Sequence, residues 1–152
     1  MPDELQYLLP QPKMLTRVGG SFVLDADTII TLLPGAEEQI IRAARSLQEE
    51  ILGATGLRPG IVLTARPART TNLILLTGDP AAARAWLPGA DLSEAGLQAN
   101  GAQAYAVSIR PERVVAGGNG ALAAFYAAQT LRQLVRGGAT RLPALDILDW
   151  PS

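Results

Sequence analysis

The sequence predicts an α+β fold: a two-layer α/β sandwich in which two main helices pack on one face of a mixed, largely antiparallel sheet. Three observations lead to this prediction. Two segments carry apolar residues at helical spacing, and seven short segments have the composition of strands. Most successive strands are joined by short turns, which favour antiparallel pairing. The 152 residues are enough for one domain with its own core, so we expect a single domain over residues 1–152.

The first half of the chain is expected to contain four strands and one helix. The strands cover residues 21–24, 28–33, 61–65 and 72–77, of which the last is a continuous apolar run suited to a central position. Pro34-Gly35 ends the second strand. The helix covers residues 37–52, with an apolar face at helical spacing, and Gly53 and Gly56 end it.

The second half is expected to contain a hairpin, a helix and a last strand. Residues 78–103 form a loop with one helical turn at 81–86. The hairpin strands cover residues 105–110 and 113–116, joined at Pro111-Glu112. The second helix runs over residues 119–136 and is closed by Gly137-Gly138, and the last strand covers residues 142–148.

Composition excludes several function classes. Thirteen Lys and Arg against 14 Asp and Glu give a net charge of −1, and the basic residues are scattered, which argues against nucleic acid or an anionic membrane as a partner. The chain has no His and no Cys, so Ser-His-Asp and Cys-His nucleophiles and nearly all zinc sites are excluded. We expect no cofactor and no metal site. Residues 1–10 lack the features of a signal peptide, which favours a cytoplasmic location, or a secreted one if a signal peptide was removed.

The segment Gly118-Asn119-Gly120-Ala121-Leu122-Ala123 fits the G-x-G-x-x-A form of the dinucleotide fingerprint, between a strand and a helix. It has two interpretations: a pyrophosphate-binding loop, or a strand-to-helix turn with Asn119 as the N-cap. The preceding hairpin and the following Pro143 fit a dinucleotide-binding unit poorly. We therefore favour the structural turn.

Pairs of carboxylates are candidate catalytic groups, because glycosidases use two at a controlled separation. Asp146 and Asp149 are three residues apart on one strand, so strand alternation places them on opposite faces. The other close pairs lie in expected loops: Asp25 with Asp27, and Asp91 with Glu94. We interpret all of them as solvated residues and expect no catalytic residue in this chain.

Trp86 and Trp150 are interpreted as core or interface residues, because a chain with only 5% aromatic residues offers little for a sugar-stacking platform. The competing function class remains an autonomous binding module for a sugar or a nucleotide. Such a module would be built on Gly118–Gly120 or on the two tryptophans.

The second helix is apolar on two sides. Its sheet-facing positions are Ala124, Ala127, Ala128, Leu131, Leu134 and Val135. On the opposite side, Leu122, Phe125 and Tyr126 form an outward stripe in the N-terminal half, whereas the C-terminal half is polar. A helix that is apolar all round is normally buried all round, so the stripe is a candidate interdomain interface. Unshielded, it reaches roughly 500 Å², and it predicts self-association of the isolated domain. Alternatively, residues 78–103 cover it.

These motifs resemble the N-terminal domain of family-20 glycoside hydrolases, the β-N-acetylhexosaminidases. The resemblance rests on the helix segment 125–134, FYAAQTLRQL, with support along the rest of the chain. Leu9-Pro10-Gln11-Pro12-Lys13 and Gly20-Ser21-Phe22 are similar to the opening of that domain, and residues 105–109 with 113–115 to its hairpin. Residues 142–147 and Asp149-Trp150-Pro151 are similar to its exit. Related domains also precede the barrels of family-84 and family-67 glycosidases.

The resemblance implies a non-catalytic accessory domain whose two helices are wedged between its sheet and a catalytic (β/α)8 barrel. The partner would be that barrel in the same parent chain. The parent activity would be substrate-assisted hydrolysis of terminal N-acetylhexosamine residues. The family's substrate-binding arginine and its Asp-Glu catalytic pair follow the exit motif, so none of their roles falls on a residue of this chain.

Overall fold

The computed structural model describes residues 12–87, 103–137 and 140–150. In this part of the chain, seven strands form one sheet in the order β1-β7-β5-β6-β4-β2-β3. The strands are β1 (Met14–Val23), β2 (Ile29–Leu32), β3 (Gly60–Leu63), β4 (Leu73–Thr77), β5 (Tyr105–Ile109), β6 (Arg113–Gly118) and β7 (Arg141–Asp149).

The sheet is mixed, as predicted, and its two halves differ in strand direction. β1, β7, β5 and β6 pair antiparallel, whereas β6, β4, β2 and β3 pair parallel. Antiparallel pairs therefore make up three of the six, a smaller share than the sequence predicted. The reason is the connection between β3 and β4, which returns the chain to the other end of the sheet without a helix, so that β4 runs in the same direction as β3.

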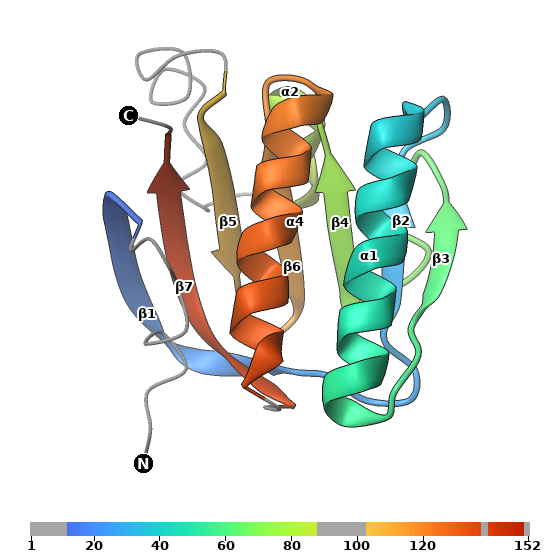
Figure 1. Cartoon of the computed structure of the whole chain (residues 1–152), viewed down its shortest axis with the longest axis vertical. Helices are drawn as coiled ribbons and strands as arrows, with labels where there is room; N and C mark the ends of the chain where they lie inside the picture. Colours follow the sequence, from blue (N-terminus) through green and yellow to red (C-terminus); the bar gives the residue numbers. More distant parts are fainter. Residues whose placement is uncertain (1–11, 88–102, 138–139, 151–152) are drawn as a thin grey trace.

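Two long helices, α1 (Glu38–Thr55) and α4 (Ala121–Arg136), lie side by side on one face of the sheet (Figure 1). The short helix α2 (Pro80–Trp86) packs on the opposite face against Leu73, Leu75 and Val115. Strand alternation separates the two cores, because Ile74, Leu76 and Val114 point to the face of the long helices instead. The α+β prediction with two main helices on one face is confirmed.

Two predicted boundaries are wrong, namely the start of β1 and the end of α1. β1 starts at Met14, seven residues before the predicted start at Ser21, because the strand continues through Gly19 and Gly20. Both glycines have positive φ, and the pairing register with β7 shifts there, which is a β-bulge. In α1, Gly53 is an interior residue, and the helix ends at Gly56 in the left-handed conformation.

None of the helices in the described part of the chain has the length and the apolar character that a bilayer crossing requires.

Candidate interdomain surface

α4 packs on the sheet through small residues. All six predicted sheet-facing positions are buried: Ala124, Ala127, Ala128, Leu131, Leu134 and Val135. The alanines bring the helix backbone close to β5 and β6, while the larger side chains fill the core between α4, α1 and the sheet. This close packing fixes which side of α4 is left facing outward.

The outward stripe of α4 consists of Leu122, Phe125 and Tyr126, and we call it the interdomain stripe. Leu122 is 38% exposed, which makes it one of the exposed large apolar side chains of the described residues. Phe125 and Tyr126 are half-buried and pack against the edge of the core, with their ring centroids 5.9 Å apart. The area of roughly 500 Å² expected for three uncovered side chains is therefore too high, because the two rings are shielded by their own domain.

Each ring of the stripe extends toward a different neighbour. Phe125 lines a shallow cleft between α4 and α1, together with Ala43 and Ser46. Tyr126 leans the other way, and its ring centroid lies 6.2 Å from that of Tyr105 on β5. The stripe is thus continuous with the α1–α4 cleft on one side and with the β5 edge of the core on the other. Residues 88–102, which would decide whether the loop covers the stripe, lie outside the described residues.

The C-terminal half of α4 is held to α1 by charge. Glu50 of α1 pairs with Arg132 at 3.2 Å and with Arg136 at 2.9 Å. The hydrogen bond from Arg136 lowers the pKa of the Glu50 carboxyl, and this effect together with the nearby positive charges outweighs the opposing effect of burial. The polar outward face of this half is therefore paired within the domain.

The Gly118–Gly120 loop is a close-packed turn. A Cβ on Gly118 would lie 2.5 Å from the Ala104 carbonyl oxygen, and one on Gly78 would lie 2.7 Å from the Gly120 carbonyl carbon. The glycines are thus required where the β4–α2 and β6–α4 connections touch, which supports the structural interpretation. The prediction of Asn119 as N-cap is wrong: Gly120 occupies that position at φ 110°, with no side-chain cap.

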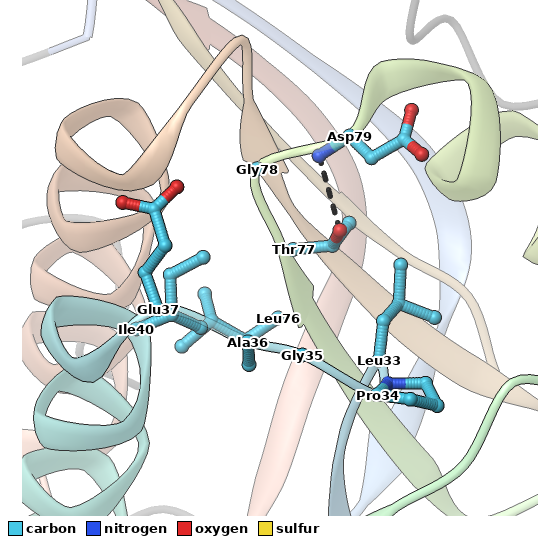
Figure 2. A pocket seen from close by; sticks show the side chains of 10 residues that line it. All are labelled: Leu33, Pro34, Gly35, Ala36, Glu37, Ile40, Leu76, Thr77, Gly78 and Asp79. Atoms are coloured by element: carbon cyan, nitrogen blue, oxygen red, sulfur yellow. Dashed lines mark hydrogen bonds between the residues drawn. The ribbon is translucent and has the colours of Figure 1, made fainter.

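A cavity of about 260 Å³ lies next to this turn, at the carboxyl ends of β2 and β4. The chain leaves β2 toward α1 and leaves β4 toward α2, which lies on the other face, so the cavity sits where the connections diverge. Its lining includes the apolar side chains of Leu33, Ile40 and Leu76. Figure 2 shows the Glu37 and Asp79 carboxylates at its rim with Gly78 between them. Asp79 also caps α2 by accepting hydrogen bonds from Ala81 and Ala82.

The carboxylates of β7 are on opposite faces, as predicted, but the prediction that they are solvated is wrong. Asp146 accepts a hydrogen bond from Ser108 at 2.6 Å and pairs with Arg110 at 2.9 Å. Asp149, on the helix-covered face, accepts a hydrogen bond from Tyr105 at 3.1 Å, and Tyr105 in turn accepts one from Thr130 at 2.8 Å. Burial raises the pKa of Tyr105 to about 12.

The remaining candidates are structural. Asp25 organises its turn by accepting hydrogen bonds from Asn72 and Asp27, and the bond from Asn72 lowers its pKa. Trp86 is 4% exposed and belongs to the core under α2, which confirms its interpretation as a core residue. The pair Asp91 and Glu94 lies outside the described residues. Within the described residues, no group of three or more acidic side chains could hold a metal ion.

A family model for glycosyl hydrolase family 20, domain 2, matches residues 5–150. The chain belongs to this family. No curated protein matches the chain. The predicted membership, which rested on the α4 and exit motifs, is confirmed.

Solved structures of family-20 proteins share the fold. The β-N-acetylhexosaminidase of Streptomyces coelicolor is similar at a TM-score of 0.69 with 19% identity, over 99% of this chain and 28% of that one. The β-hexosaminidase of Streptomyces plicatus gives 0.68 with 20% identity, over 99% and 27%. The chitobiase of Flavobacterium johnsoniae gives 0.68 with 18% identity, over 99% and 22%. The chain therefore spans about a quarter of the length of these relatives.

Proposed function

We propose that this chain is a non-catalytic domain that packs against the catalytic (β/α)8 barrel of a longer family-20 enzyme and supports it. The longer protein would hydrolyse terminal N-acetylhexosamine residues, since the Streptomyces coelicolor relative is named a β-N-acetylhexosaminidase and the Streptomyces plicatus relative a β-hexosaminidase. Membership of domain 2 of the family and the length of those relatives support the proposal.

One observation carries the proposal: α4 is apolar on its outward side only in its N-terminal half, where Leu122 stays exposed. In its C-terminal half, the outward Arg132 and Arg136 pair with Glu50 of the same domain. Exposed apolar side chains beside half-buried aromatic rings are the usual composition of the core of a protein interface. A barrel seated on this end of α4 would cover the interdomain stripe and the adjoining α1–α4 cleft.

The described residues also support a non-catalytic role. The best-placed carboxylates, Asp146 and Asp149, lie on opposite faces of β7, and each is occupied by hydrogen bonds within the domain. Hydrolysis of a glycosidic bond, including the substrate-assisted kind, needs a carboxyl group that is free to protonate the leaving oxygen. We therefore expect that the catalytic groups belong to another part of the parent protein.

The second candidate, a small-ligand binding module, is favoured by the cavity between β2 and β4. Its rim carboxylates, Glu37 and Asp79, repel phosphate, so a sugar fits it better than a nucleotide. The sequence that follows Ser152 in the gene distinguishes the two candidates. A barrel sequence there supports the accessory domain, and a stop codon supports the module.

Activity gives the direct test. We expect the 152-residue chain to show no turnover of a chromogenic N-acetylhexosaminide, and the longer protein to hydrolyse it. Asp146→Ala and Asp149→Ala variants serve as controls for any residual activity of the chain. Turnover by the pure chain that either substitution abolishes would contradict the non-catalytic role.

A further inference from the structure

The carboxylate of Asp149 joins four separate parts of the chain. It is the last residue of β7, and its side chain is only 12% exposed. One oxygen, Oδ1, accepts a hydrogen bond from the backbone N–H of Lys13 at 3.1 Å and lies 3.9 Å from its Nζ. The other, Oδ2, accepts the hydroxyl of Tyr105. This arrangement is a relay, because Tyr105 accepts a hydrogen bond from Thr130 of α4.

The same lysine holds the first residue after β7. Lys13 Nζ donates a hydrogen bond to the carbonyl oxygen of Trp150, and it lies 5.3 Å from the centroid of the Trp150 ring, within cation–π range. Trp150 is half-buried against the core on the side of α2. Both the backbone and the ring of Trp150 are therefore restrained where the chain leaves the sheet. We call the set Lys13, Tyr105, Thr130, Asp149 and Trp150 the exit latch.

The exit latch reaches the interdomain stripe. The Tyr105 ring contacts Tyr126, a member of the stripe, with centroids 6.2 Å apart. In Figure 1, the arrowhead of β7 and the N-terminal end of α4 lie at the same end of the molecule. The direction in which the chain leaves β7 and the apolar end of α4 are thus linked by a continuous run of contacts.

We propose that Asp149 is a positioning residue, which through the exit latch directs the segment after β7 toward the N-terminal half of α4, where the catalytic barrel docks. The inference rests on the proposed function and names the residues that would set the orientation of the two domains. The phenol of Tyr105 stays neutral because burial raises its pKa to about 12, so it donates to the carboxylate throughout the physiological range. A hydrogen bond to a charged acceptor inside a protein is stronger than a neutral one.

The first experiment measures the exit itself in the chain as it stands. In a Trp86→Phe background, the fluorescence comes from Trp150 alone, since the sequence has two tryptophans. We expect Asp149→Ala to raise the acrylamide quenching constant of Trp150 about twofold or more, because the exit opens locally. Lys13→Met, which leaves the Tyr105–Thr130 bond in place, should raise it as well.

The matched control is Asp146→Ala. Asp146 is on the same strand, is similarly buried with its side chain 16% exposed, and pairs with Arg110 at 2.9 Å, but it lies on the opposite face. The Asp146→Ala substitution should lower the free energy of unfolding without changing the acrylamide quenching constant of Trp150. An equal quenching constant of Trp150 with and without the Lys13→Met substitution would contradict the role of the exit latch, even if Asp149→Ala fails to fold.

The second experiment uses the longer protein and scanning calorimetry. We expect one cooperative unfolding transition in the wild type, a split into two in Asp149→Ala, and a single shifted transition in Asp146→Ala. A split transition already in the wild type would argue against docking and thus against the proposed function. A single transition in both wild type and Asp149→Ala would leave docking intact and refute the role of Asp149.

Discussion

The two halves of α4 differ in the character of their outward faces. The C-terminal half fixes its outward charged side chains within the domain, because Glu50 of α1 meets both Arg132 and Arg136. The N-terminal half rests on a glycine-rich turn and leaves Leu122 exposed beside half-buried rings. The charged side chains of one half are paired within the domain, whereas the other half leaves an apolar side chain exposed. This difference between the two ends of one helix is the basis on which we propose an interface at the N-terminal end.

The largest expected effect on stability comes from the closely packed glycines that precede the N-terminal half of α4. A Cβ on Gly117 would lie 1.9 Å from the carbonyl oxygen of Thr77, its partner on β4. Because that contact is with backbone, the sheet itself must shift, and overpacking of this kind costs more than the typical ~1–3 kcal/mol. We expect Gly117→Ala to be largely unfolded by circular dichroism at 25 °C, a temperature at which the wild type is folded.

Gly53→Ala is the control for Gly117→Ala. Gly53 is inside α1, and a Cβ there meets nothing within 4 Å. Since alanine favours a helix interior over glycine, this variant should gain roughly 0.5–1 kcal/mol in the free energy of unfolding. A Gly117→Ala protein as stable as Gly53→Ala would show that β6 and β4 are not closely packed at Gly117.

The second expected effect concerns the charged half. Glu50→Gln should lower the free energy of unfolding by about 1 kcal/mol at pH 7, since the pairs are partly open to solvent. The folded-state pKa of Glu50 is lowered, so its contribution is present above the ordinary value of 4.5 and is lost as the pH falls through the folded-state value. The stability difference between the two proteins should therefore shrink below about pH 4 in denaturant titrations.

Glu38→Gln is the matched control, because Glu38 forms a comparable pair with Arg42 at 2.8 Å on the same helix but is largely exposed to solvent. Its effect should stay within about 0.5 kcal/mol at any pH. A pH-independent loss in Glu50→Gln would mean that packing, and not charge, joins the two helices.

Periodicity was sufficient to predict the parts of the molecule that depend on local pattern. The two long helices, the central strand at residues 73–77 and the buried face of α4 follow from apolar spacing alone. The parallel half of the sheet does not, because the turn-like residues between β3 and β4 say nothing about which way the next strand runs. The short connection between them favours antiparallel pairing, but β3 and β4 both pair parallel to β2.

The candidate site was predicted in its apolar part and missed in its polar part. Leu122, Phe125 and Tyr126 stood out because apolar residues are unexpected on an outward helical face. Asp149 did not, because its partners Tyr105 and Thr130 meet it only through the β5–β7 register and the placement of α4. Such a register depends on tertiary packing, and no local pattern in one sequence reveals it.

The smallest expected effect on stability concerns the interdomain stripe, and it is the one that tests docking. Leu122→Gln should change the free energy of unfolding of the chain by no more than about 0.5 kcal/mol, because Leu122 is 38% exposed and is not part of the core cluster. Phe125→Gln should cost more, because the half-buried ring packs against the core and lines the α1–α4 cleft. Denaturant titrations of both variants give these values.

In the longer protein, Leu122→Gln should become the more costly of the two substitutions, because covering Leu122 adds apolar burial that the isolated chain lacks. At ~25 cal/mol per Å², a leucine that becomes buried contributes on the order of 1–2 kcal/mol, and Leu122→Gln would lose that amount. Val18→Gln is the control, since Val18 is 45% exposed on edge strand β1 and should be neutral in both proteins. Sedimentation velocity of the isolated chain completes the test, because an uncovered stripe should support weak self-association that Leu122→Gln removes. If Leu122→Gln and Val18→Gln behave alike in both the chain and the longer protein, the barrel does not dock on the N-terminal half of α4.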